Sequence, residues 1–274
     1  MKTTELIDII KNNKIVIYGA GYVAKNFYKA LKVRGLCDRV VCFIVSEIGN
    51  GVEELYGIPV KEAKDLINQK DLYICIAVHE TIRNEIEEYL SKYDVDKYIW
   101  IHPYIMELAL GEVIAYHKPV KIKEIMQDQK YDEYKYAVAI RYLAIENFYN
   151  KNNIGYQIYL KALNLQCEKE TAKKRLNSFI RLITNWDERG YQEEYDILID
   201  ERKRLIDGTH RLSLACYHKM EWIYCNIFPY SPNYGQFLKK NHFLSIETLL
   251  ENHFTVCELE ALKEVQKRMM MYTL

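Results

Sequence analysis

Short apolar runs alternate with amphipathic stretches along roughly the first hundred residues. The apolar runs are rich in β-branched and aromatic residues and lie at 15–18, 40–45, 71–78 and 97–103. Each run is too short for a helix, so each predicts a buried strand. Between the runs, 22–32 and 80–93 repeat apolar residues at helical spacing. Strands that alternate with helices form parallel sheets with right-handed crossovers, so we predict an α/β domain over residues 1–115.

A glycine turn follows the first predicted strand. Its sequence is GAGYVA, a GxGxxA pattern placed between a strand and a helix. Gly19 would permit the tight turn, Gly21 would let an anion approach the backbone, and Ala24 would allow close packing of helix on strand. Glu47 follows the second strand, where dinucleotide-binding domains hold a ribose. The predicted ligand contacts are Gly19, Ala20, Gly21, Tyr22, Val23 and Glu47.

Three stretches of this domain, IVIYGAGYVAK, YGIPV and YICIAV, resemble a known group. They are similar to the small Rossmann-like domains at the front of bacterial surface-glycan enzymes, including sugar acyltransferases of the PglD type. The resemblance implies that the glycine turn faces a nucleotide-sugar or a related nucleotide. NAD(H) and a scaffold that binds no nucleotide stay open as alternatives.

The middle of the chain predicts helices. No Gly or Pro interrupts the sequence between Pro119 and Gly155, and apolar residues recur at helical spacing at Ile125, Tyr134, Val138, Tyr142 and Ile145. We interpret residues 116–165 as a helical connector. Its tyrosines predict packing between domains or in a homodimer, since tyrosine combines an apolar ring with a polar tip.

The last part, residues 166–274, predicts a strand hairpin, a helix and another strand. The strands are 195–200, 204–207 and 221–228, and the helix starts in GTHRLSLACYHK. The motif DGTHR therefore falls between a strand and the first turn of a helix.

Each residue of DGTHR has a predicted role. Gly208 permits a sharp turn and Thr209 caps the helix, whose amides and dipole form an anion site. Arg211 offers a rigid fork suited to phosphate. His210 donates to phosphate or moves a proton, and Asp207 binds a metal ion or orients His210.

Residues 176–230 resemble the ParB/sulfiredoxin-like fold, in which a DGxHR turn opens a helix after a hairpin. The resemblance implies that the turn cradles nucleotide phosphates. Sulfiredoxins need a cysteine where this chain has Thr209, and no basic helix-turn-helix follows as in partition proteins. The remaining branch is kinase-like. It implies ATP or CTP with Mg²⁺, with Gly208 and Thr209 on phosphate and Asp207, His210 and Arg211 as catalytic residues. The base stays open between Glu168, Glu193 and Glu194.

Composition limits the partners. Lysine plus arginine and aspartate plus glutamate each number 38, so the formal net charge is zero and gives no basic footprint for nucleic acid. No apolar run reaches the roughly 18 residues that span a bilayer, and no signal peptide is evident. The seven cysteines form no CxxC pair, which favours free thiols in a reducing compartment. We expect a cytoplasmic protein.

Together these patterns predict an α/β protein with a Rossmann-like parallel sheet, a helical connector and a ParB/sulfiredoxin-like α+β domain. The function expected first is a nucleotide-dependent phosphotransferase that acts on a small metabolite or sugar in surface-glycan biosynthesis. Two alternatives stay open: a non-catalytic protein that senses a nucleotide or nucleotide-sugar, and an NAD(P)-dependent sugar-nucleotide enzyme. The last lacks a YxxxK pair in a suitable place.

Overall fold

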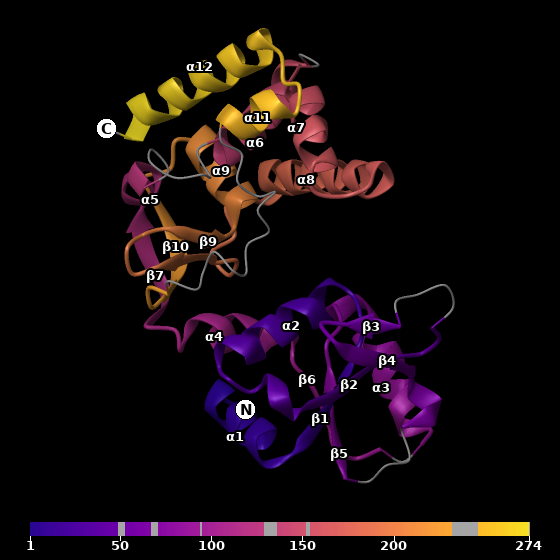
Figure 1. Cartoon of the computed structure of the whole chain (residues 1–274). Coiled ribbons are helices and arrows are strands. Elements are labelled where there is room, and N and C mark those ends of the chain that lie inside the picture. The colour runs from indigo at the N-terminus through magenta and orange to yellow at the C-terminus, as the bar shows by residue number, and fades with distance from the viewer. Residues whose placement is uncertain are drawn as a thin grey trace. The chain divides into compact units, whose positions relative to one another are not determined.

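The computed structural model is mixed α/β and divides into two compact units (Figure 1). Of the described residues, the first unit contains Met1–Glu112 and Ser231, and the second contains Val113–Tyr230 and residues 246–273. The structure describes residues 1–48, 53–66, 71–93, 95–128, 136–151, 154–231 and 246–273.

The first unit is built on a mostly parallel sheet. Its strands are β1 (Lys14–Tyr18), β2 (Val40–Val45), β3 (Glu54–Leu55), β4 (Ile58–Glu62), β5 (Leu72–Ile76) and β6 (Tyr98–Trp100). They lie in the order β3-β4-β2-β1-β5-β6, and every neighbouring pair is parallel except β3 with β4. The four apolar runs of the sequence coincide with β1, β2, β5 and β6. The chain order reverses between β1 and β5, which places the glycine turn after β1 at that point of the sheet.

Helices complete the first unit. They are α1 (Thr3–Asn12), α2 (Tyr22–Val33), α3 (Arg83–Ser91) and α4 (Ile105–Leu110), with short 3-10 turns at Cys37–Arg39, Ala63–Asp65, Glu80–Ile82 and His102–Tyr104. Helix α2 buries Phe27, Ala30 and Leu31, which accounts for the spacing in the sequence. Helix α1 was not predicted, although Leu6 and Ile10 are fully buried on one side of it.

The second unit contains a smaller, mixed sheet. Its strands are β7 (Ala115–Lys121), β8 (Ile197–Asp200), β9 (Leu205–Asp207) and β10 (Trp222–Phe228), in the order β7-β10-β8-β9. Strand β10 is parallel to β8, whereas β7 and β9 are antiparallel edge strands. Residues 115–121 therefore form a strand of this sheet, and the prediction of a helical connector from residue 116 was wrong at its start.

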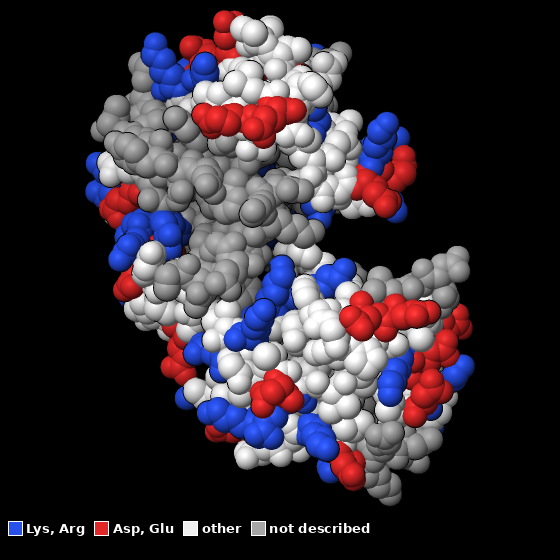
Figure 2. All heavy atoms as spheres, viewed as in Figure 1, with Lys and Arg blue, Asp and Glu red and all other residues white. Residues whose placement is uncertain are grey.

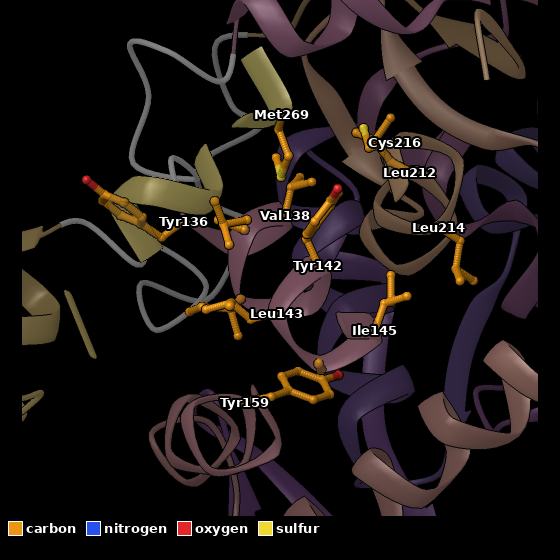
Figure 3. Packing of buried hydrophobic residues seen from close by; sticks show 14 of the residues in the cluster. Tyr136, Val138, Tyr142, Leu143, Ile145, Tyr159, Leu212, Leu214, Cys216 and Met269 are labelled. Atoms are coloured by element: carbon orange, nitrogen blue, oxygen red, sulfur yellow. The ribbon is translucent and has the colours of Figure 1, made fainter. Parts of the chain in front are cut away.

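Helices enclose the core of the second unit. They are α5 (Ile122–Asp128), α6 (Ala137–Asn150), α7 (Ile154–Asn164), α8 (Lys169–Arg189), α9 (Thr209–Tyr217), α11 (Ile246–Glu251) and α12 (Val256–Thr273). Helix α6 is apolar around most of its circumference, as a central helix must be, and it packs against α7, α9 and α12. Figure 3 shows its residues Tyr142, Leu143 and Ile145 among Tyr159, Leu212 and Met269.

The helices predicted as a connector thus belong to the core of the second unit. Tyr136, Tyr142 and Tyr159 are each at most 6% exposed, because neighbouring helices of the same unit cover them. These three tyrosines cannot form the predicted homodimer surface. Tyr134, also part of the predicted stripe, lies outside the described residues.

Two further observations bear on the expectations from composition. Among the described helices, none has the length and apolar character to cross a membrane. All seven cysteines are free thiols, and burial raises the pKa of the Cys216 and Cys225 thiols to about 12. These two thiols therefore stay protonated and unreactive at neutral pH.

Candidate functional site

The DGTHR motif lies at the junction of β9 and α9, the strand and helix predicted for it. Gly208 has a φ of 102°, and a Cβ there would lie 2.4 Å from Cγ2 of Ile197 on β8. Both the positive φ and the close approach require glycine. The exposed Asp207 accepts a hydrogen bond from the Gly208 N–H at 2.8 Å through Oδ1. The carboxylate therefore fixes the turn.

Thr209 does not cap the helix, contrary to the prediction. Gly208 is the N-cap residue of α9, and no side chain makes a capping hydrogen bond there. Thr209 is the first helical residue, and its carbonyl accepts a hydrogen bond from the Ser213 hydroxyl at 2.7 Å. Because the first amides of a helix lack partners within the helix, the start of α9 can donate to an anion.

His210 is enclosed by aromatic rings from two other helices. Its Nε2 lies 2.6 Å from the hydroxyl of Tyr159 on α7, and its ring centroid lies 4.7 Å from that of Phe179 on α8. Burial lowers the pKa of His210 well below its usual value, and the charges of Arg141, Arg211 and Arg175 lower it further. The imidazole is therefore neutral at pH 7.

Tyr159 shares this environment. The residue is 1% exposed, and burial raises the pKa of its hydroxyl while Arg141 and Arg175 partly oppose the rise. The Arg141 guanidinium lies 5.4 Å from the centre of the Tyr159 ring and donates to the Ala137 carbonyl at 2.8 Å. Its buried Nε has no hydrogen-bond partner among the described residues. Arg141 thus keeps an N–H group that could donate a hydrogen bond to a ligand.

Three guanidinium groups act together on His210. They come from α6 (Arg141), α8 (Arg175) and α9 (Arg211), and each lowers the same pKa. None of the three forms an ion pair with a carboxylate within the part of the chain that the structure describes. Arg141 and Arg211 are partly buried, and charged side chains in such positions usually have counter-charges. Together with the exposed Arg175 they form an arginine cluster (Arg141, Arg175 and Arg211) that is suited to a ligand with negative charge.

A hollow of about 300 Å³ lies beside the arginine cluster. It is lined by Leu182, Asn185, Trp186, Gly190, Tyr191, Gln192, Tyr195 and Arg211. The Arg211 guanidinium lies 5.0 Å from the centre of the Tyr195 ring, a cation–π contact. Arg211 therefore belongs both to the cluster and to the wall of the hollow.

The residues predicted as a catalytic base differ in their positions. Glu168 is the exposed N-cap residue of α8. Glu193 and Glu194 are exposed in the segment between α8 and β8, and their neighbours Gln192 and Tyr195 line the hollow. In the described part of the chain, no three His, Cys, Asp or Glu side chains are grouped as metal ligands.

The glycine turn of the first unit has the predicted local geometry. Gly19 has a φ of 119°, and a Cβ there would lie 2.8 Å from the carbonyl oxygen of Ala77. Gly21 is the N-cap of α2, with a φ of −82°, and a Cβ there would contact nothing within 4 Å. The backbone at Gly21 is therefore open to close approach by a ligand.

The other predicted contacts surround this turn at varying depth. Tyr22 is 56% exposed, whereas Ala20 and Val23 are half-buried. Glu47 is exposed after β2, and the neighbouring Ser46 hydroxyl lies 2.9 Å from that of Tyr18. A ligand on the turn could reach Glu47 without displacing a buried side chain.

The charge distribution agrees with the neutral composition. Figure 2 shows both acidic and basic side chains on the viewed face of each unit.

Several residues of the site were missed in the sequence. Arg141, Arg175, Tyr159 and the rings of the hollow were not among the predicted site residues. Arg141 did carry a signal, because it stands alone in the apolar stretch AVAIRYLAI. No protein-family model, curated protein or solved structure matches the chain, so both family resemblances remain predictions.

Proposed function

We propose that this protein is a nucleotide-dependent phosphotransferase whose second unit binds ATP or CTP at the DGTHR turn. The observation that carries the proposal is the arginine cluster, whose members have no carboxylate partner among the described residues. Arg211 follows His210 in the first turn of α9, and the Arg141 guanidinium lies 5.4 Å from the ring of Tyr159, whose hydroxyl is 2.6 Å from His210. Arg175 on α8 adds to the positive charge that lowers the pKa of His210. Guanidinium groups bind phosphate oxygens strongly and can neutralise charge that develops during phosphoryl transfer.

The geometry suggests a role for each residue. The amides of the first turn of α9 and the Arg211 guanidinium would hold phosphate, and Arg141 and Arg175 would add charge. His210, neutral and hydrogen-bonded to Tyr159, would position the start of α9 instead of moving a proton to the ligand.

A magnesium ion fits this site if the nucleotide supplies most of its ligands. Mg²⁺ in such sites is commonly held by one or two carboxylates together with substrate phosphates. Asp207 is exposed at the turn, and its Oδ1 accepts the Gly208 N–H, the one hydrogen bond that its carboxylate makes with the described residues. Its other oxygen could contact the ion, which would supply charge neutralisation for the phosphates.

The first unit would hold the acceptor or a nucleotide-sugar. Its parallel strands lie in the order β4-β2-β1-β5-β6, and in open parallel sheets ligands bind where the strand order reverses, which supports a ligand at that point. The glycine turn follows β1 at that point, and the open Gly21 supports a ligand there. NAD(H) is the other ligand that this turn could accept.

A second candidate function is a non-catalytic nucleotide sensor. One observation favours it: among the described residues, the hollow is lined by aromatic, amide and apolar side chains and by Arg211, which are groups suited to binding a ligand. The two candidates share the nucleotide site and differ only in turnover.

Calorimetric titration with ATP and CTP, with and without Mg²⁺, tests the proposal. We expect binding that Arg211→Ala weakens at least tenfold and that Arg181→Ala leaves unchanged. Arg181 is a matched control because it is exposed on α8 and does not act on His210. Phosphorus NMR with a panel of sugars and small hydroxyl compounds would then detect transfer.

The outcomes separate the candidates. Transfer that depends on Arg211 supports the phosphotransferase, and tight binding without turnover on any acceptor supports the sensor. Binding of NAD(H) alone, abolished by Gly21→Val, would overturn both in favour of an NAD(P)-dependent enzyme.

A further inference from the structure

The hollow beside Arg211 is built from aromatic rings at the end of α8 and in the segment directly after it. Trp186 comes from the last turns of α8, and Tyr191 and Tyr195 from the segment that follows it. The ring centroids of Trp186 and Tyr191 lie 5.4 Å apart, with 46° between the planes. The hollow therefore presents π surfaces at more than one orientation to a group inside it.

Besides Arg211 and the polar atoms of the aromatic side chains, the hollow presents two side-chain amides. Asn185 and Gln192 each provide one acceptor and two donors. Such side chains can hydrogen-bond the edge of a heteroaromatic ring, and the aromatic side chains can stack on its face. A volume of about 300 Å³ is at the lower end of ligand pockets, which suits one planar ring system better than a whole nucleotide.

We propose that this hollow binds the base of the nucleotide whose phosphates lie at the DGTHR turn. The inference rests on the proposed function and adds the part of the ligand that the arginine cluster does not explain. Arg211 connects the two subsites. Its guanidinium contacts the Tyr195 ring in the hollow, and its backbone follows His210 in the first turn of α9. The ligand class is thereby a nucleotide, not inorganic polyphosphate or a sugar phosphate.

Contacts with residues outside the hollow fix two of its aromatic side chains. The Tyr191 hydroxyl accepts a hydrogen bond from the Tyr224 N–H at 2.9 Å, and the Trp186 ring stacks on His218 with 15° between the planes. Tyr195, 49% exposed, lies at the rim. Side chains that are fixed before binding lose little entropy when the ligand enters. A nucleotide should therefore bind more tightly than a polyphosphate that lacks the base.

Tryptophan fluorescence tests this assignment directly. The chain has three tryptophans, and Trp100→Phe with Trp222→Phe leaves Trp186 in the hollow as the only reporter. In this variant ATP or CTP should quench the fluorescence saturably, while tripolyphosphate should bind the cluster without comparable quenching. Calorimetry on the unmodified chain should show nucleotide binding about ten- to a hundredfold tighter than tripolyphosphate binding, the usual gain from stacking a base.

Tyr195→Ala provides a second measurement, since its exposed position makes a folding defect small. It should weaken nucleotide binding more than tripolyphosphate binding, whereas Tyr116→Ala, at a 63% exposed position of β7, should change neither. Equal affinities for nucleotide and tripolyphosphate, without quenching of Trp186, would refute binding of the base in the hollow. That result would still be consistent with a phosphate site at the DGTHR turn. If neither ligand binds, the proposed function itself has failed.

Discussion

Replacing Gly208 by alanine should destabilise the second unit for two separable reasons. A φ of 102° is rarely adopted by an L-residue, and holding one in such a sparsely populated conformation costs about 1–3 kcal/mol. The added Cβ would lie 2.4 Å from Cγ2 and 2.6 Å from Cβ of the buried Ile197. Overpacking of this kind costs about another 1–3 kcal/mol. Gly208→Ala should therefore lower the free energy of unfolding by about 2–6 kcal/mol.

Gly35→Ala is the control, because Gly35 also has a positive φ, 68°, but a Cβ there would contact nothing within 4 Å. It should cost only about 1–2 kcal/mol, the backbone part. Urea unfolding would be followed by tryptophan fluorescence, with Trp100→Phe reporting on the second unit and Trp186→Phe with Trp222→Phe on the first. If the free energy of unfolding falls by about 2 kcal/mol per M urea, Gly208→Ala should lower the urea concentration at the unfolding midpoint by about 1–3 M. A cost no larger than that of Gly35→Ala would refute the packing argument.

Three further predictions concern the same structural features. The lowered pKa of His210 means that the unfolded chain binds its proton more tightly, so stability should fall as pH drops below about 6.5, by up to about 1.4 kcal/mol per pH unit. His210→Gln should flatten most of this fall between pH 7 and 5 in urea unfolding, with His218, whose pKa is also lowered, leaving a residual slope. Tyr159→Phe should cost about 1–3 kcal/mol in the same assay, since it removes a buried hydrogen bond, and an unchanged midpoint would contradict the contact with His210. Gly19→Ala should destabilise the first unit, because its Cβ would lie 2.8 Å from the carbonyl oxygen of Ala77. Gly21→Ala should leave the free energy of unfolding within about 0.5 kcal/mol of the wild-type value.

Patterns that act over a few residues were predicted well from the sequence. The apolar β-branched runs correspond to strands because burial on both faces of a parallel sheet demands such residues. Strand β7 was missed because it lies at a sheet edge, where few of its residues are buried. Four consecutive residues, Tyr116–Pro119, are exposed, and no alternation of apolar and polar residues marks the strand in the sequence. Pro119 is itself tolerated there only because β7 is an edge strand.

The site divides in the same way. Gly208 has a local role, set by the turn and readable from residue type. The hydrogen bond of Asp207 with the Gly208 N–H is also local, but from the sequence Asp207 was predicted to bind a metal ion or orient His210. The inward position of His210 had a weak signal, because Ser213 and Leu214, three and four residues later, are fully buried on the same side of α9. In the arginine cluster only Arg141 carried a signal of its own. Nothing in the sequence showed that it would meet Arg175 and Arg211, because α6, α8 and α9 come together through tertiary packing, which spacing along the chain does not encode.

The central claim is that Arg141, Arg175 and Arg211 form one phosphate site at the start of α9. The most direct measurement is calorimetric titration of the full chain with tripolyphosphate, in the wild type and in the three single Arg→Gln variants. Charged hydrogen bonds of this kind are worth about 1.5–3 kcal/mol, so Arg141→Gln and Arg211→Gln should each weaken binding about ten- to a hundredfold. The exposed Arg175→Gln should weaken it less, and Arg181→Gln should leave it unchanged. Wild-type affinity in all three variants, or no binding by the wild type, would contradict the claim.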